Sequence, residues 1–194
     1  KKHNIKVIHV VPSVKHAKKA ESVGCDAIVG EGYEAGGHNG PDEITTFSLI
    51  PQLCDNVSIP VIAAGGIADR RQYKAAMILG AMGVQIGTMF AASKESSASM
   101  EYKNAIIEAQ DNSTFIAFRR IGLVRMLKNK YGVRVIEKES NPITVEELRH
   151  LLGEKRERLG IFEGNTDEGM LEAGQSSGLV NEILSVHDIF KKLI

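Results

Sequence analysis

Hydrophobic and polar residues divide the first 111 residues into continuous apolar runs and amphipathic segments. The apolar runs predict strands at residues 5–11, 26–31, 60–64 and 83–87. Continuous runs, rather than alternating ones, are typical of strands buried on both faces of a parallel sheet. Segments with helical periodicity follow each run and predict helices at 14–24, 45–56, 68–80 and 94–110. This repeat of strand, loop and helix predicts an α/β fold.

The remaining residues, 112–194, have a different pattern. Basic or mixed-charge amphipathic segments predict helices at 119–133 and 144–160, with a loop around Asn141–Pro142 between them, and a last helix is predicted at 179–194. We expect these residues to form a helical cap and a closing C-terminal helix on the α/β part, and not an independent domain. The sequence therefore divides into a partial barrel or sheet at 1–111 and a cap at 112–194.

Two architectures contain this repeat, a doubly wound sheet and a (β/α)₈ barrel. Both place ligands at the carboxyl ends of their strands, and glycines gather at these ends here. Four strands are too few for a barrel, and an open four-stranded parallel sheet would leave an apolar edge uncovered. The pattern therefore predicts a truncated fold in which the N-terminal part is missing.

Composition excludes several classes of function. Hydrophobic residues make up 43% of the chain, charged residues 25%, and the formal net charge is zero. This balance gives no sign of a nucleic-acid or membrane partner, and no apolar run approaches the roughly 20 residues of a membrane-spanning helix. Cys25 and Cys54 belong to no metal or redox motif. We expect reduced, structural thiols, no metal site and a cytoplasmic protein.

Glycines at the ends of the third and fourth predicted strands indicate an anion site. In AAGGI (63–67) and QIGT (85–88), Gly65, Gly66 and Gly87 allow backbone N–H groups to approach an anion without a Cβ between them. Thr88 adds a hydroxyl donor. The alternative is that these glycines only make tight turns between strand and helix. Two clusters on successive strands favour phosphate binding.

The segment EGYEAGGHNG (31–40) raises the question of why three glycines surround a single histidine. Gly36 and Gly37 would let the loop fold closely over a flat ligand, with His38 projecting into the site. An imidazole there can accept a proton near neutral pH. The alternative is a loop histidine bonded to a backbone carbonyl. No Asp or Cys at a triad or zinc-ligand spacing accompanies it, and Glu34 could either orient the loop or contact substrate.

Three segments, EGYEAGGHNG, IPVIAAGGIAD and GVQIGTMFAASKES, strongly resemble the nitronate monooxygenase family in order and spacing. That family includes the flavin-dependent enoyl-acyl-carrier-protein reductases of type II, and the tail EGNTDEGMLEAGQSSGLV resembles this branch. The resemblance covers nearly the whole chain. It implies a TIM (β/α)₈ barrel that binds FMN, of which this chain is the later half, with a C-terminal helical cap and the N-terminal half missing. Arg70 is a departure, because the family usually has glycine there.

The resemblance also implies roles for individual residues. His38 matches the catalytic histidine, which takes the α-proton of a nitroalkane in the monooxygenases and lies beside the substrate in the reductases. The two glycine-rich strand ends match the FMN phosphate site, and the loop before the histidine passes beside the flavin. The implied cofactor-binding residues are Gly36, Gly37, Gly65, Gly66, Gln85, Ile86, Gly87 and Thr88.

Oxidation of nitronates or nitroalkanes with dioxygen is the activity that the resemblance implies first. The alternative is an enoyl-acyl-carrier-protein reductase of fatty acid synthesis, with NAD(P)H as co-substrate. The second alternative is an inactive half-barrel fragment or a partner-binding module. We expect a small-molecule substrate, a nitronate or an enoyl thioester, and neither a nucleic-acid nor a membrane partner; a homodimer is left open.

Overall fold

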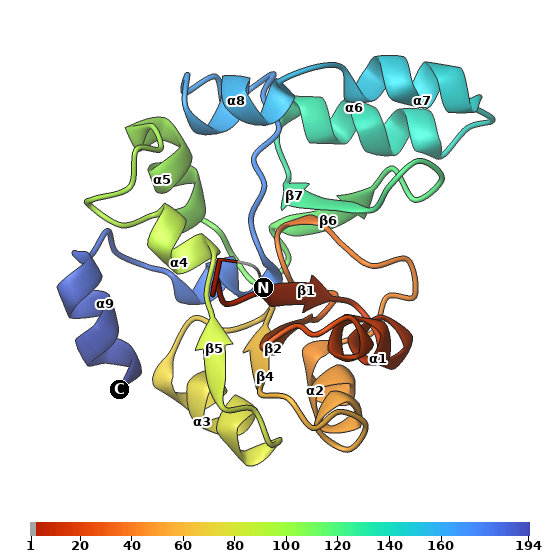
Figure 1. The fold of residues 1–194 in the computed structure, drawn as a ribbon. Coiled ribbons are helices and arrows are strands. Elements are labelled where there is room, and N and C mark those ends of the chain that lie inside the picture. Colours follow the sequence, from red (N-terminus) through yellow and green to blue (C-terminus); the bar gives the residue numbers. More distant parts are fainter. Residues whose placement is uncertain (1–2) are drawn as a thin grey trace.

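A four-stranded parallel sheet lies at the centre of the computed structural model, which describes residues 3–194 (Figure 1). The strands lie in the order β1-β2-β4-β5, and each neighbouring pair is parallel. All four strands predicted from the apolar runs are confirmed, and so is the α/β class. The strands are β1 Ile8–Val11, β2 Ala27–Glu31, β4 Val61–Ala64 and β5 Gly83–Gln85.

Three helices connect successive strands and pack against the sheet (Figure 1). Leu53 of the second helix packs so closely on β2 that a Cβ at Gly30 would lie 2.4 Å from its Cδ1 atom. Pro51 lies inside that helix and does not interrupt it. The helix loses one backbone hydrogen bond there but buries Leu53 and its apolar neighbours. The helices are α1 Val14–Ser22, α2 Thr46–Cys54 and α3 Arg70–Ile78.

The first strand is more exposed than the sequence predicted. Ile8 and Val10 of β1 are 55% and 43% exposed, whereas Ile28 and Val29 of β2 are buried. The physical reason is the position of β1 at the edge of the sheet, where no further strand of residues 3–194 covers its outer side. Burial on both faces is therefore correct for β2 and wrong for β1 in this structure.

A second group of helices forms another core beside the sheet. Tyr102 and Ile106 pack there with Leu171 and Ile189, and each is at most 2% exposed. The predicted last helix, 179–194, is helical only from residue 186, because the Ser185 side chain accepts from the backbone N–H of Asp188 and caps the helix. The helices of this group are α4 Thr88–Ala91, α5 Met100–Ile107 and α9 Val186–Leu193.

A three-stranded antiparallel sheet, in the order β3-β7-β6, corrects the prediction of an all-helical cap. The helix predicted at 119–133 is wrong, because β7 occupies the middle of that segment and all four of its residues are buried. A turn at residues 118–122, in which Gly122 has φ +143°, joins β6 to β7. Pairing with β3 and β6 satisfies the backbone of β7 and overrides its helical periodicity. The strands are β3 Gly37–His38, β6 Thr114–Ala117 and β7 Val124–Leu127.

The cap also contains helices that differ in extent from those predicted. The segment 144–160 forms two helices, because Gly153 adopts φ +65° and ends the first of them. A loop around Asn141–Pro142 is present as predicted. No helix within residues 3–194 combines the length and apolarity needed to cross a membrane. The cap helices are α6 Lys130–Glu139, α7 Val145–Leu152, α8 Arg156–Ile161 and the 3₁₀ helix η1 Gln175–Leu179.

Candidate active site

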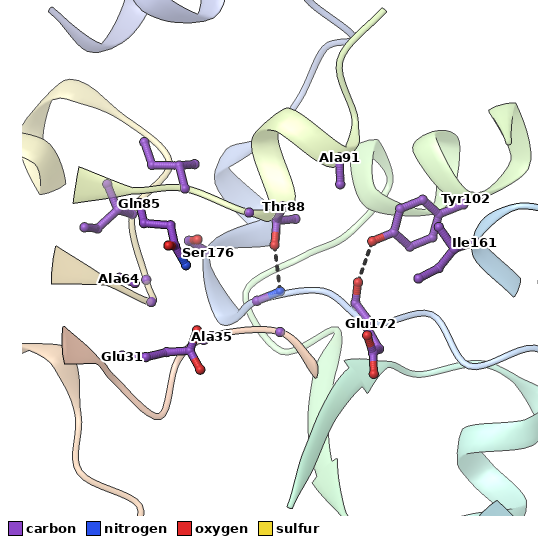
Figure 2. Close-up of a pocket in the computed structure, with 17 residues that line it drawn as sticks. Glu31, Ala35, Ala64, Gln85, Thr88, Ala91, Tyr102, Ile161, Glu172 and Ser176 are labelled. Carbon is purple, nitrogen blue, oxygen red and sulfur yellow. Dashed lines mark hydrogen bonds between the residues drawn. The ribbon is translucent and has the colours of Figure 1, made fainter. Parts of the chain in front are cut away.

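The carboxyl ends of β2, β4 and β5 meet at one edge of the parallel sheet, and a cavity of about 260 Å³ lies there (Figure 2). One part of its wall comes from the ends of these strands and the loops that follow them. Residues of the cap form another part. Seven of the nine residues that the sequence singled out line this cavity. They are Gly36, Gly65, Gly66, Gln85, Ile86, Gly87 and Thr88.

The loop after β4 has a backbone conformation that favours glycine. Gly65 and Gly66 have φ +91° and +72°, in the left-handed region where other residues are strained. A Cβ at Gly65 would lie 2.8 Å from the carbonyl oxygen of Gly32. Within residues 3–194, neither amide donates a backbone hydrogen bond. The loop therefore presents two free N–H donors, as an anion site requires.

The end of β5 provides the second wall of the same cavity. A Cβ at Gly87 would meet open space, since no atom of the described residues lies within 4 Å of it. The Thr88 hydroxyl oxygen accepts from the backbone N–H of Gly174 at 2.9 Å, as Figure 2 shows. This bond fixes the oxygen and leaves the hydroxyl hydrogen available to donate to a ligand. Both strand ends thus offer donors to the same space.

Glu34 anchors the loop that carries the histidine. Its carboxylate accepts from the backbone N–H of Thr46 at 2.8 Å and from the Thr46 hydroxyl at 3.0 Å. The same hydroxyl lies 2.9 Å from the carbonyl oxygen of Gly65. Because Glu34 joins the loop after β2 to the start of α2 and to the loop after β4, it orients the loop, which is the first of its two predicted roles.

Gly37 and His38 do not line the cavity but directly follow Gly36, which does, and this side of the cavity is called its mouth below. Together they form β3, which pairs with Val124 and Arg125 of β7. The His38 side chain is 69% exposed, and its Nδ1 atom lies 3.9 Å from Oε1 of Glu172, a residue of the cavity wall. Within residues 3–194, the His38 side chain forms no hydrogen bond with a backbone carbonyl, which was the alternative interpretation of this residue.

The chain is similar in sequence to known proteins. The sequence model described as nitronate monooxygenase matches residues 1–194. A Staphylococcus saprophyticus protein named probable nitronate monooxygenase is 36% identical over 193 residues, which are 94% of this chain and 54% of that protein. The chain belongs to the nitronate monooxygenase family. It spans about half the length of this curated relative.

Two solved structures are similar in fold to this member of the nitronate monooxygenase family. FabK from Thermotoga maritima has a TM-score of 0.92 and 39% sequence identity, covering 99% of this chain and 60% of its own. A nitroalkane oxidase from Streptomyces ansochromogenes has a TM-score of 0.81 and 27% identity, covering 98% of this chain and 57% of its own. Both similarities extend over the parallel sheet and over the cap.

The cavity of this family member also contains side chains that sequence reasoning missed. Glu31 ends β2, and burial raises the pKa of its carboxyl group. Glu31 could have been found, because it is a carboxylate that directly follows a continuous apolar strand. Tyr102 donates to the carbonyl oxygen of Glu172 at 2.5 Å, and Ser176 lies across the cavity. Tyr102 lies on α5, where no local motif marks it, whereas Glu172 and Ser176 lie in the segment EGNTDEGMLEAGQSSGLV, whose resemblance assigned no role to single residues.

Proposed function

We propose that this chain carries the FMN-phosphate and proton-accepting parts of an oxidoreductase that oxidises nitronates or nitroalkanes with dioxygen. The observation that carries the proposal is the convergence of two glycine-rich strand ends on one cavity, with His38 at its mouth. Neither a turn-forming role for the glycines nor a solvated loop histidine requires this convergence. Membership of the nitronate monooxygenase family supports the same function.

The residues present fit the phosphate end of FMN. Gly65, Gly66 and Gly87 would donate backbone N–H groups, and Thr88 would donate its hydroxyl. A side chain on Gly87 would project into the open space where the phosphate is proposed, which explains glycine there. The cavity of about 260 Å³ is slightly smaller than the 300–1,000 Å³ of ordinary ligand pockets, so it suits this end of the cofactor and not the whole of it.

FMN supplies the electron-transfer chemistry when it is bound, and the chain supplies position and a proton acceptor. In the proposed reaction the Nε2 atom of His38 takes the α-proton of a neutral nitroalkane. The C–H bond breaks, its electron pair moves onto the nitro group, and the proton stays on the imidazole. A general base of this kind contributes about 10²–10⁴ to the rate. The exposed imidazole at the cavity mouth is accessible to such a substrate.

We further infer that the four-stranded sheet is the later half of a (β/α)₈ barrel, with residues 112–194 as its cap. The parallel order β1-β2-β4-β5 supports this inference, as do the exposed apolar side chains of β1. The chain covers 57–60% of the two solved structures, which leaves room in them for the other strands. The remaining wall of the flavin pocket would then come from the segment that this chain does not match.

A second candidate is an NAD(P)H-dependent enoyl-acyl-carrier-protein reductase. The observation that favours it is the similarity to FabK, an enoyl-acyl-carrier-protein reductase II, which exceeds the similarity to nitroalkane oxidase in both identity and TM-score. His38 serves either reaction, because it would lie beside the substrate in both. The site residues alone therefore do not distinguish the two chemistries.

Anaerobic mixing separates the two candidates. The FMN-loaded, full-length protein is mixed with a nitronate in one experiment and with NADPH in another, and the flavin absorbance is followed. We expect the nitronate to bleach the flavin and dioxygen to restore it. Rapid bleaching by NADPH, followed by transfer to an enoyl thioester, would establish the reductase instead. A full-length protein that shows no flavin absorbance after addition of FMN would contradict both.

A further inference from the structure

A carboxylate from the cap lies against the histidine at the cavity mouth. Oε1 of Glu172 is 3.9 Å from Nδ1 of His38, although the two residues are far apart in the sequence. Strand β7 holds both of them. His38 pairs with Val124, and Glu172 forms an antiparallel bridge with Met126 two residues further along the same strand. Backbone pairing with β7 therefore brings the two residues together and sets the points from which their side chains extend.

The backbone around Glu172 is held from a second direction. The Tyr102 hydroxyl donates to the carbonyl oxygen of Glu172 at 2.5 Å, from α5, as Figure 2 shows. Leu171, the preceding residue, accepts through its carbonyl oxygen from the backbone N–H of Leu127 at 2.9 Å. These contacts fix the point from which the carboxylate extends, and they leave its side chain free to face the cavity.

Glycine at position 37 makes room for this carboxylate. Gly37 has φ +80°, and a Cβ there would lie 3.2 Å from Oε2 and 3.3 Å from Cδ of Glu172. Both the backbone conformation and the tight space favour glycine. Contact with a flavin would not explain glycine at position 37, because Gly37 does not line the cavity. The space needed by the Glu172 carboxylate does explain it.

Among residues 3–194, charged groups on β3 and α8 influence the Glu172 carboxyl group. Burial raises the pKa of the Glu172 carboxyl group, the charge of His38 on β3 opposes this rise, and Glu157 on α8 adds to it. The neighbouring group on α5 is the Tyr102 hydroxyl, which is bonded to the backbone of Glu172. Within residues 3–194, Glu172 forms no ion pair with Lys or Arg. Of the basic groups in the described part of the chain, the imidazole is thus the partner through which the carboxylate can act.

We propose that Glu172 is a positioning residue for His38, on the basis of the function proposed above. Its carboxylate accepts a hydrogen bond from the Nδ1–H group of His38, which fixes the tautomer and leaves Nε2 as the proton-accepting nitrogen. The observed 3.9 Å exceeds a hydrogen bond, and such contacts tighten when substrate is positioned. After proton transfer, the carboxylate stabilises the imidazolium, as a carboxylate does for the histidine of a catalytic triad.

The first test compares Glu172→Gln with a matched control, Glu137→Gln, which changes an exposed carboxylate on α6. Flavin reduction is measured in the holoenzyme with a neutral nitroalkane and with its preformed nitronate, over a range of pH. For Glu172→Gln we expect a loss of about 10- to 100-fold on the neutral nitroalkane, as for other partners that orient a histidine. The nitronate rate stays unchanged, and the acid limb of the pH–rate profile moves to lower pH. Equal rates in both variants on the neutral substrate would overturn the proposal.

The second test needs no activity. The carboxyl carbon of Glu172 is titrated by NMR in the holoenzyme, in His38→Asn and in the control His150→Asn, whose residue lies on α7. The pKa of Glu172 rises in His38→Asn, because the charge that opposes burial is removed, and it stays constant in the control. An unchanged pKa in His38→Asn refutes the pairing. A changed pKa in a protein that oxidises no nitroalkane would refute the proposed function and leave the pairing intact.

Discussion

Substitution of Gly36 by alanine tests how closely the cap packs on the histidine loop. A Cβ at this position would lie 2.5 Å from the carbonyl carbon of Ala173 and 2.7 Å from the backbone nitrogen of Gly174. Both are backbone atoms, so neither can rotate away as a flexible side chain would. The cap segment must move, and Gly36→Ala therefore disturbs the site without altering any polar group.

The size of the effect follows from the contacts that this movement breaks. Overpacking in a close contact costs about 1–3 kcal/mol. The same segment is held by the hydrogen bond from Gln175 N–H to the Glu34 carbonyl oxygen, at 2.8 Å, and by that from Gly174 N–H to Thr88. Each contributes about 0.5–1.5 kcal/mol. Alanine also restricts the unfolded chain, which offsets about 0.4–1 kcal/mol. We expect a net loss of about 2–5 kcal/mol.

Urea unfolding followed by circular dichroism measures this loss, with an unchanged slope as the check on two-state behaviour. The matched control is Gly83→Ala, because a Cβ at Gly83 would meet nothing within 4 Å and its backbone is not left-handed. We expect the free energy of unfolding of the control to stay within about 1 kcal/mol of that of the parent protein. If Gly36→Ala were as stable as Gly83→Ala, the close packing of cap on loop would be refuted.

Three further changes probe other parts of the site. Thr46→Val removes the hydroxyl that joins Glu34 to the Gly65 carbonyl, so urea unfolding should show a loss of about 1–3 kcal/mol, whereas Thr46→Ser should retain most of the stability. Burial raises the folded-state pKa of Glu31 above 4.5, so its contribution to stability is present below that pH and is lost as the pH rises through the folded value. The free energy of unfolding of Glu31→Gln, relative to that of the parent protein, should therefore increase as the pH rises. The same difference between the two proteins at pH 4 and at pH 8 would contradict this. Thr88→Val removes one proposed phosphate donor and should weaken FMN binding by about tenfold in a fluorescence titration, with riboflavin binding unchanged as the control.

The parallel sheet and the cavity could be predicted because their signals are local. Each strand is a continuous apolar run, and glycines follow the runs that end at Ala64 and Gln85. Once the strands are parallel, their carboxyl ends must lie at the same edge, so the two glycine clusters meet without further information. The same reasoning brings the loop of His38 to that edge.

The antiparallel sheet could not be predicted because β3 comes from a distant segment and β7 lies in a run of helical periodicity. β3 has only two residues, and it is a strand only because β7 pairs with it. The sequence of β7, VRML, lies within a segment of helical periodicity, and tertiary pairing decided its structure. Glu172 is placed by the same strand, so its contact with His38 was equally invisible before the fold was known.

The rate of flavin reduction in FMN-loaded, full-length His38→Ala tests the central claim most directly. The neutral nitroalkane and its preformed nitronate are supplied separately, and flavin absorbance confirms that the variant retains FMN. We predict a loss of about 10²–10⁴ on the neutral nitroalkane, because its proton acceptor is gone, and little change on the nitronate, which has already lost that proton. An unchanged rate on the neutral nitroalkane would remove His38 from the reaction and contradict the account.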